Sequence, residues 1–533
     1  MKSLREYRAA VDGFAWALPQ RFNFARDVVD RFAVEPDRPA LLFRDGSGQT
    51  TRFGYGELSR SIHRFASVIH ALDIAPGEPI MVLLPPIPEW QISVVGAMAA
   101  GVVVVPTSIA LLGEEDVDHR GRHSGAVAIV ATHAHAALID RLSPSWPRLR
   151  HRLFVSEENA PPAPPDAWID FHEALRSGDP DHPVQDTELS DPALILYTSG
   201  TTGPPKAVLH DHGYPYASAR QASHWHGLKS DDRFWPTTGW AKAAFVPWSV
   251  GAEIVVSRER LAPAAQIEAI GVLGPTVFCA PPTQYRAMVK QDLAGLRSSR
   301  LRECVAAGEP LNPEVIEAWR DGTGMTLRDG YGQSEAGLLV ANLVGLPPRP
   351  GSMGLPLPGF SVDVIDEDGR VRAAGSEGDL AVRWPAPGLF AGYWKDPAAT
   401  EASRRGAWYL TGDRASRDAD GYLWFVGRAD DVIVSGSQRI GPFEVESRLL
   451  AHVDVVEAAA VAKPQPELGQ VIEAWIVLRE GAAESPTLRE ELGELFSEGE
   501  SERRPSTFRF VQSLPKTATG KILRHRLRAR SAT

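Results

Sequence analysis

The sequence contains very little cysteine. Only two of its 533 residues, Cys279 and Cys304, are cysteines. Two thiols are too few for a disulfide framework or for a zinc site with four thiolate ligands. Both stand among apolar neighbours, so we expect them to be small core residues. Low cysteine usage fits a reducing compartment, and it predicts a cytoplasmic location.

The chain also lacks an excess of positive charge. It has 56 Lys and Arg against 67 Asp and Glu, which gives a net charge of −11. A protein that binds nucleic acid presents a basic surface, so this balance argues against that class and against a nucleic-acid partner. Basic residues do gather near the C-terminus, between Arg503 and Arg528. The simplest interpretation of that cluster is a solvated tail.

Long uninterrupted apolar runs are missing as well. The opening residues, MKSLREYRAAVDGFAW, do not contain the apolar stretch of a signal peptide. The uncharged segment 92–112 contains Gly101, Pro106 and polar residues. A helix that spans a membrane needs about 20 apolar residues without such turn formers. We therefore expect no transmembrane segment, and we interpret 92–112 as buried core.

What the sequence does contain is a regular alternation of helical and strand patterns. Apolar strand patterns such as PIMVLLP and AVAIVAT alternate with helical segments through the first half of the chain, which indicates parallel sheets with crossover helices. From about Val362 the strands alternate with period two between Gly and Asp-Gly turns, which indicates antiparallel pairing. The tail from Asp431 holds enough strands and helices for a small α+β domain of its own.

A phosphate-binding loop is the strongest single motif. The segment Tyr197-Thr-Ser-Gly-Thr-Thr-Gly-Pro-Pro-Lys206 follows a buried strand pattern. Its glycines allow a close backbone approach, its four hydroxyls can donate hydrogen bonds, and its lysine adds positive charge, which together suit a polyphosphate. A Walker loop requires Gly-Lys followed by Ser or Thr, whereas Pro205 precedes Lys206 and Ala207 follows it. A P-loop kinase or ATPase is therefore not expected.

Further motifs follow this loop in a fixed order. They are Asp329-Gly-Tyr-Gly-Gln-Ser-Glu335, Trp408-Tyr-Leu-Thr-Gly-Asp413, Gly427-Arg-Ala-Asp-Asp431, Arg439-Ile-Gly-Pro-Phe-Glu444 and Leu514-Pro-Lys-Thr-Ala-Thr-Gly-Lys521. In this order and spacing the chain resembles the acyl-adenylate-forming superfamily of acyl-CoA synthetases, aryl-CoA ligases, luciferases and peptide-synthetase adenylation domains. The segments GWAKAAF, CAPPTQYR, AAGEPLNPEV and RIGPFEVE make it most similar to medium-chain acyl-CoA synthetases and their acetyl- and benzoyl-type relatives. The resemblance runs from about residue 20 to about residue 528.

This resemblance implies an α/β fold in two parts. The expected N-terminal domain, residues 1–429, has αβαβα sheet layers and a distorted β-barrel from about residue 350. The expected C-terminal domain, residues 430–533, is a small mobile α+β lid. A hinge at Asp430 would let this lid turn between the two half-reactions.

The resemblance also implies an AMP-forming acid–CoA ligase. The enzyme would join a carboxylic acid to ATP as an acyl-adenylate with release of pyrophosphate, and would then pass the acyl group to coenzyme A with release of AMP. It implies ATP, Mg²⁺ and coenzyme A, and a substrate that is a medium-chain fatty acid or an aromatic carboxylic acid. Mg²⁺ prefers oxygen ligands, which Glu335 and Thr201 offer. The residues expected at ATP or AMP are Thr198, Ser199, Gly200, Thr201, Thr202, Gly203, Lys206, Gly308, Glu309, Pro310, Asp329, Gly330, Tyr331, Gly332, Gln333, Ser334, Asp413, Arg428 and Arg439.

Lys521 is the expected catalytic residue. Negative charge builds on the phosphate oxygens when the acid attacks the α-phosphorus, and a lysine ammonium, with a reference pKa of about 10.4, can neutralise it. The acid is already a carboxylate anion, so this step needs no general base. By resemblance, the acyl pocket contains Trp240, Ala307, Gly332 and Ala336, and the coenzyme A path contains Gly436, Ser437 and Gln438.

Two departures from the family pattern leave alternatives open. Relatives carry Ser-Gly-Tyr/His-Arg where this chain has Gly436-Ser437-Gln438-Arg439, so the acceptor could instead be the thiol of a carrier protein or an amine. The stretch from Trp240 to Trp248 is shorter than in medium-chain relatives, which leaves the chain length of the acid open. A catalytically silent nucleotide- or acyl-binding protein on the same fold is the remaining alternative. Both a monomer and a homodimer are compatible with the sequence.

Overall fold

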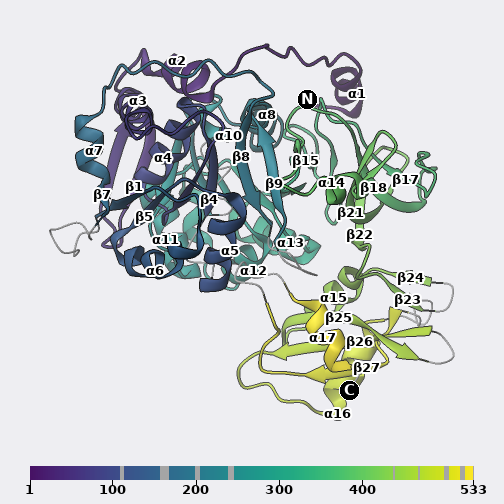
Figure 1. Cartoon of the computed structure of the whole chain (residues 1–533). Coiled ribbons are helices and arrows are strands. Elements are labelled where there is room, and N and C mark those ends of the chain that lie inside the picture. Colours follow the sequence, from purple (N-terminus) through teal and green to yellow (C-terminus); the bar gives the residue numbers. More distant parts are fainter. Residues whose placement is uncertain are drawn as a thin grey trace.

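The protein consists of a large lobe and a smaller C-terminal lobe (Figure 1). The computed structural model describes residues 1–107, 113–156, 167–198, 205–237, 245–435, 438–465, 469–496, 503–516 and 522–531. The small lobe hangs below the large one in Figure 1 and is reached through the segment that follows β22 (Leu423–Arg428). The next strand, β23 (Ile433–Ser435), already belongs to a different sheet.

The first sheet of the large lobe is mixed and has the order β19-β9-β8-β4-β3-β5-β6-β7. Its centre is parallel, as the apolar strand patterns predict, whereas β9 and β19 pair antiparallel at one edge. Its strands are β3 (Pro79–Leu83), β4 (Val103–Thr107), β5 (Ala128–Thr132), β6 (His151–Val155), β7 (Ile169–Asp170), β8 (Pro192–Tyr197), β9 (Ala207–Asp211) and β19 (Gly392–Tyr393). Helix α3 (Tyr55–Ala71) precedes β3, and the helices between the strands are α4 (Pro88–Ala99), α5 (Glu114–Ser124), α6 (Ala136–Leu142) and α7 (Phe171–Ser177), with short 3-10 turns at His133–His135 and Ser143–Ser145.

Within the uncharged segment 92–112, the described residues 92–107 are confirmed as α/β core, whereas residues 108–112 lie outside the described chain. Its first part belongs to α4, which is buried along almost its whole length, and it continues into the fully buried strand β4. None of the helices in the described ranges combines the length and the apolar character that a membrane span requires.

The second sheet of the large lobe has the order β16-β15-β14-β13-β12-β10-β11-β1-β2. Its middle strands are again parallel, and both edges are antiparallel. Its strands are β1 (Pro39–Arg44), β2 (Thr50–Gly54), β10 (Arg233–Pro236), β11 (Glu253–Ser257), β12 (Val277–Ala280), β13 (Glu303–Ala307), β14 (Leu327–Gln333), β15 (Gly337–Ala341) and β16 (Leu355–Pro356). Cys279 and Cys304 lie on β12 and β13 and are buried core residues, as expected.

Helices enclose this second sheet and join it to the first. Proline at the first turn begins several of them, where its fixed φ suits a helix and its missing N–H removes no helical bond. The helices are α8 (Gly213–Gln221), the π-helix η5 (Ala222–His226), α10 (Phe245–Trp248), α11 (Pro263–Leu273), α12 (Pro282–Met288), the 3-10 turn η6 (Ala294–Ser298) and α13 (Pro313–Thr323). The N-terminal residues form α1 (Leu4–Asp12), the π-helix η1 (Ala25–Asp30) and α2 (Arg31–Ala33).

A five-stranded antiparallel sheet completes the large lobe. It lies in the part of the chain, from about Val362, for which the period-two pattern predicts antiparallel strands. Its strands are β17 (Val362–Ile365), β18 (Glu377–Arg383), β20 (Arg404–Arg405), β21 (Trp408–Arg417) and β22, and α14 (Pro397–Ala402) lies beside it. On neighbouring strands β21 and β22, Asp413 and Arg428 occupy paired positions of the register. This pairing brings two of the predicted site residues together through backbone geometry alone.

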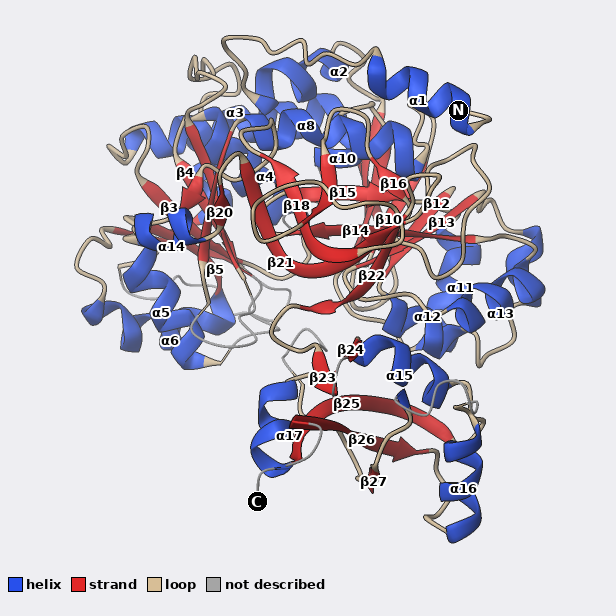
Figure 2. Cartoon of the chain, turned by 90° about the vertical axis from the view of Figure 1, so that its right-hand side faces the viewer, coloured by secondary structure: helices blue, strands red, loops and turns tan. Residues whose placement is uncertain are grey.

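The small lobe has its own sheet and its own hydrophobic core. Its strands are β23, β24 (Gln438–Ile440), β25 (Val455–Gln465), β26 (Gly469–Leu478) and β27 (Thr507–Phe510). Its helices are α15 (Pro442–Leu450), α16 (Pro486–Glu494) and α17 (Arg524–Ser531). Figure 2 shows β25 and β26 crossing this lobe below α15, with α16 and α17 at opposite ends. A separate core supports the expectation of a domain-sized α+β unit.

Candidate active site

A cleft of about 1550 Å³ lies between the two lobes. Its walls come from the large lobe, through residues such as Thr198, Tyr331 and Asp413, and from the small lobe, through Lys516 and Arg524. A cleft of this size can enclose a nucleotide together with a second substrate. Most of the residues predicted to bind ATP therefore line one cavity.

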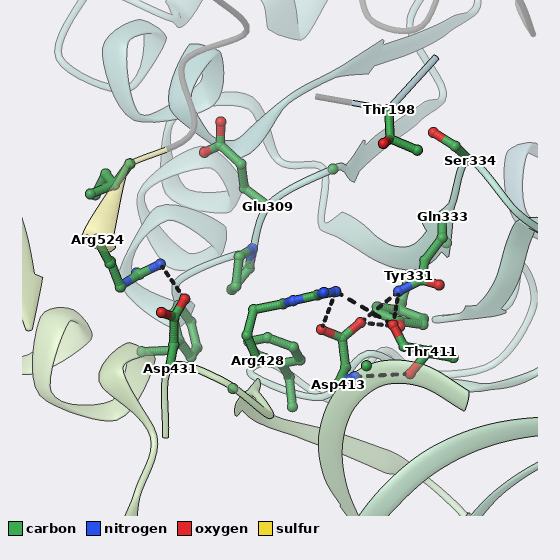
Figure 3. Close-up of a pocket in the computed structure, with 18 of the residues that line it drawn as sticks. Thr198, Glu309, Tyr331, Gln333, Ser334, Thr411, Asp413, Arg428, Asp431 and Arg524 are labelled. Atoms are coloured by element: carbon green, nitrogen blue, oxygen red, sulfur yellow. Dashed lines mark hydrogen bonds and ion pairs between the residues drawn. The ribbon is translucent and has the colours of Figure 1, made fainter. Parts of the chain in front are cut away.

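A buried carboxylate, Asp413, organises one end of the cleft (Figure 3). Its side chain is only 5% exposed. Arg428 Nη1 donates to Asp413 Oδ1 at 3.1 Å, and Gln333 Nε2 donates to Oδ2 at 2.8 Å. The Tyr331 hydroxyl also donates to Oδ2. Burial raises the pKa of Asp413, and the charge of Arg428 opposes that rise.

This arrangement suits the sugar of a nucleotide. A carboxylate has two acceptor oxygens, which match two neighbouring ribose hydroxyls. The ring of Tyr331 lies beside it and offers an aromatic face to a base. Gln333 is held in place by further bonds, because its Nε2 also donates to the Thr411 carbonyl at 2.8 Å and its Oε1 accepts from Tyr409 at 3.0 Å.

Asp329 is a second buried carboxyl group on the wall of the cleft. Its Oδ1 accepts a hydrogen bond from the Gly330 N–H at 2.9 Å. Burial raises the pKa of Asp329 to about 8, so the group is largely protonated at neutral pH. A protonated carboxyl can donate as well as accept, which a purine edge could use.

The two ends of the phosphate loop are fastened to each other. Thr198 N–H donates to the Lys206 carbonyl at 2.9 Å, and Lys206 N–H donates to Thr198 Oγ1 at 3.2 Å. These two hydrogen bonds extend the antiparallel pairing of β8 with β9 by one residue on each strand. Thr198 and Lys206 line the cleft. The other predicted loop residues, Ser199, Gly200, Thr201, Thr202 and Gly203, lie outside the described residues.

Glu335 lies close to this loop and is the described member of the predicted metal pair. It is 9% exposed, and its Oε1 accepts from the Tyr393 hydroxyl at 3.0 Å. The Lys206 ammonium sits 4.8 Å from the centre of the Tyr393 ring. Within the described ranges, no cluster of three or more His, Cys, Asp or Glu side chains could hold a metal. A single carboxylate beside a triphosphate still fits Mg²⁺, which keeps waters and phosphate oxygens as its other ligands.

The Gly308-Glu309-Pro310 segment lines the cleft between the two lobes. Gly308 has a φ of +100°, which favours glycine. Glu309 Oε2 accepts from Arg286 Nη2 at 3.0 Å and from the Thr283 hydroxyl. Thr283 and Arg286 lie on α12, within CAPPTQYR, and sequence reasoning did not assign them to the site. Together with Tyr393 they were missed because their role depends on tertiary contacts.

The segment around the predicted catalytic lysine reaches the cleft from the small lobe. Lys521 itself lies outside the described residues. Lys516 and Ile522, on either side of it, form an isolated antiparallel bridge, and both line the cleft. Arg524 and Arg528 follow on α17 and also line it.

Arg439 is placed differently from the prediction. Its side chain lies in a second hollow of about 530 Å³, whose wall includes Asp366, Glu367, Asp368 and Asp379. The physical reason is that Arg439 belongs to β24, a strand at the edge of the small lobe's sheet. In this arrangement of the lobes that edge does not form part of the nucleotide cleft.

The acyl and coenzyme A positions are only partly described. Gly332 lines the cleft, whereas Ala336 is 2% exposed and Ala307 ends β13, and neither belongs to the cleft wall in the described part of the chain. Trp240, Gly436 and Ser437 lie outside the described residues. Gln438 begins β24, and Asp430 lies in the segment between β22 and β23.

Family models match most of the chain. The model described as AMP-binding enzyme matches residues 28–394, and that of the AMP-binding enzyme C-terminal domain matches residues 444–521. The interval between the two matches, residues 395–443, includes the passage from β22 of the large lobe to β23 of the small lobe.

Curated relatives match over nearly the full length. Acyl-coenzyme A synthetase ACSM4, mitochondrial, of Rattus norvegicus is 39% identical over 536 residues, covering 96% of this chain and 91% of that protein. Acyl-coenzyme A synthetase ACSM3, mitochondrial, of Mus musculus is 35% identical over 548 residues, covering 99% and 93%.

Solved structures agree in fold. The anthranilate CoA ligase AuaEII in complex with anthranoyl-AMP has a TM-score of 0.86 and 28% identity, covering 96% of this chain and 98% of that one. A benzoate CoA ligase from Burkholderia xenovorans LB400 has a TM-score of 0.82 and 29% identity, covering 95% and 100%. The predicted α/β fold with a small C-terminal lobe is thereby confirmed.

Proposed function

The chain belongs to the AMP-binding enzyme family, and from this premise we propose that it activates a carboxylic acid with ATP and transfers the acyl group to coenzyme A. The observation that carries the proposal is the cleft itself. At one end it has the buried carboxylate of Asp413, which suits a ribose. Thr198 and Lys206, the two described ends of the phosphate loop, line its wall, and Lys516 and Ile522, on either side of Lys521 in the chain, line it from the opposite lobe. ATP, Mg²⁺ and coenzyme A are the partners that this chemistry requires.

In the first half-reaction an oxygen of the acid attacks the α-phosphorus of ATP. The bond between the α-phosphorus and the bridging oxygen breaks, and pyrophosphate leaves. Asp413, Tyr331 and Arg428 hold the nucleoside, which fixes the position of the α-phosphate. The Lys521 ammonium neutralises the charge that builds on the phosphate oxygens. Mg²⁺ supplies further charge neutralisation when bound, and Glu335, oriented by Tyr393, would hold it.

In the second half-reaction the thiolate of coenzyme A attacks the acyl carbonyl. A carbon–sulfur bond forms, the carbon–oxygen bond to the phosphate breaks, and AMP leaves. We propose that the small lobe turns about Asp430 between the two steps, which withdraws Lys521 from the cleft. Gly436, Ser437 and Gln438 would then border the path of the thiol.

We propose a medium-chain or aromatic carboxylic acid as the substrate. Support for an aromatic acid comes from the similar solved structures of an anthranilate CoA ligase and a benzoate CoA ligase. A panel of aliphatic and aromatic acids, scored by pyrophosphate release, tests this proposal. Pyrophosphate release that does not depend on the acid, or formation of ADP in place of AMP, would overturn the proposed ligase function.

The acceptor is tested separately. Coenzyme A is the proposed acceptor, and the names of the curated relatives support it. The alternative acceptor is a carrier-protein thiol or an amine. It is suggested by the sequence Gly436-Ser437-Gln438, which departs from the family pattern. Equal amounts of coenzyme A and of a phosphopantetheinylated carrier protein, offered to the enzyme with acid and ATP, separate the two. Faster transfer to the carrier protein would reject coenzyme A.

Location and assembly complete the proposal. A cytoplasmic location rests on low cysteine usage, and the mitochondrial relatives argue against it. Fractionation of the cells that produce the protein decides between the two compartments. A monomer or a homodimer is proposed, and the mass measured by light scattering distinguishes them.

A further inference from the structure

The two consecutive aspartates at the lobe junction face opposite lobes. Asp430 Oδ1 lies 3.8 Å from Arg428 Nε, so it faces the arginine that holds Asp413 in the large lobe. Asp431 instead pairs with α17 of the small lobe. Its Oδ1 accepts from Arg528 Nη1 at 2.5 Å, and its Oδ2 lies 3.7 Å from Arg524 Nη1 (Figure 3).

Arg524 connects this junction to the rest of the small lobe. Its Nη2 donates to both carboxylate oxygens of Glu446 on α15, at 2.8 Å each. Glu446 is 6% exposed, and its Oε1 also accepts from the Ala460 N–H on β25 at 2.9 Å. Paired charges that are this well bonded and shielded have a fixed geometry. We call Asp431, Arg524 and Glu446 the junction clamp.

The junction clamp is next to the predicted catalytic lysine in the sequence. Arg524 is the first residue of α17 and stands three residues after Lys521 in the sequence. Lys516, before Lys521, pairs with Ile522, directly after it, in an antiparallel bridge. The lysine segment is therefore fastened at its C-terminal end to the residue after the proposed hinge. β23, in contrast, follows the junction directly in the chain and leads to positions 436–438.

We propose that Arg524 is a positioning residue for the first half-reaction. Through Asp431 and Glu446 it fixes the lysine segment to the junction, so that rotation about Asp430 delivers Lys521 to the α-phosphate in the correct place. This inference rests on the proposed function and assigns a residue to one of its two steps. The competing explanation is that the clamp only stabilises the folded lobe.

The test uses the full-length enzyme with Asp431→Asn and Arg524→Lys. Asp431→Asn removes one charge and keeps the Arg524–Glu446 pair, and Arg524→Lys keeps the charge but cannot bridge both carboxylates. Arg526→Gln is the matched control, because Arg526 lies on the same helix, is exposed, and its side chain makes no hydrogen bond or ion pair within the described part of the chain. Adenylation is measured by acid-dependent exchange of labelled pyrophosphate into ATP, and transfer by thioester formation from supplied acyl-adenylate and coenzyme A.

We expect the kcat of adenylation to fall about 10-fold or more in both clamp variants, since small misplacements of a catalytic group are costly. The KM for ATP and the rate of transfer stay within about 3-fold, because the nucleotide contacts and the β23 connection are untouched. Arg526→Gln changes neither step. Equal loss of both steps, with a lowered melting temperature, would show that the clamp is only structural.

The outcomes also separate this inference from the proposed function. A wild-type chain that forms no acyl-adenylate with any acid rejects the proposed function and the role of Arg524 together. Normal adenylation in Asp431→Asn and Arg524→Lys rejects the role of Arg524 alone. Thermal unfolding of each variant identifies a loss that comes from unfolding.

Discussion

Arg428 supplies the sharpest single perturbation of the nucleotide end of the cleft. In Arg428→Gln the buried carboxylate of Asp413 keeps its bonds from Tyr331 and Gln333 but loses its charged partner at 3.1 Å. A hydrogen bond to a charged group contributes about 1.5–3 kcal/mol. The Arg428 side chain is 42% exposed, so solvent screens part of this energy. We take the lower half of that range, about 1.5–2 kcal/mol, which corresponds to a 10- to 30-fold rise in the KM for ATP.

The pH dependence of this variant gives a second, independent readout. Burial raises the pKa of Asp413 and Arg428 opposes that rise, so removing Arg428 raises the pKa of this carboxyl further. Ribose hydroxyls donate to the ionised carboxylate, and the protonated form accepts them less well. The KM for ATP of Arg428→Gln should therefore increase as the pH falls, and this increase should begin at a higher pH than in the wild type.

The assay is pyrophosphate exchange at several ATP concentrations and pH values. Arg417→Gln is the control, because Arg417 lies on the same sheet and pairs with Asp363, and neither residue belongs to the cleft wall in the described chain. Arg428→Lys keeps the charge and should recover part of the loss. An unchanged KM for ATP in Arg428→Gln, or a KM with the same pH profile as the wild type, would refute the assignment of Asp413 to the ribose.

Three further predictions concern other contacts of the cleft. Burial raises the pKa of Asp329 from 3.8 to about 8, so the unfolded state loses this proton first and the free energy of unfolding decreases as the pH rises from about 4 to about 8. Asp329→Asn should therefore flatten the decline of the melting temperature between pH 4 and 8, and a decline equal to that of the wild type would contradict it. Asn312 Nδ2 donates to Ser447 Oγ across the lobes at 2.8 Å, so Asn312→Ala should weaken the present lobe arrangement by about 1 kcal/mol and slow adenylation about 5-fold, without transfer being slowed. Tyr393→Phe removes the donor to Glu335 and should raise the Mg²⁺ concentration needed for half-maximal exchange several-fold, while the KM for the acid stays constant; an unchanged requirement would separate Tyr393 from the metal site.

The nucleotide end of the site could be predicted from the sequence because its residues lie in short motifs on well-defined strands. Asp413 and Arg428 stand on neighbouring strands of one antiparallel sheet, so their register brings them together. Thr198 and Lys206 meet for the same reason, at the end of β8 and the start of β9. In both cases the local pattern determines the geometry, and the order of the motifs identifies the chemistry.

Contacts between distant elements could not be predicted in this way. Tyr393 reaches Glu335 from β19, and Thr283 reaches Glu309 from α12, although no pattern in either segment indicates a partner. Arg439 was expected near the phosphates, yet it lies beside acidic residues of the antiparallel sheet. Its position depends on how the small lobe is turned, which is a property of the lobe contacts and not of the motif that contains Arg439.

The central claim is that Lys521 on the small lobe acts in adenylation and not in transfer. The direct measurement compares both half-reactions in Lys521→Ala. We predict a loss of about 100-fold or more in acid-dependent pyrophosphate exchange, on the scale seen when one charge-stabilising donor is removed, and a near-normal rate of thioester formation from supplied acyl-adenylate. Equal loss of the two rates, or unimpaired exchange, would contradict the account.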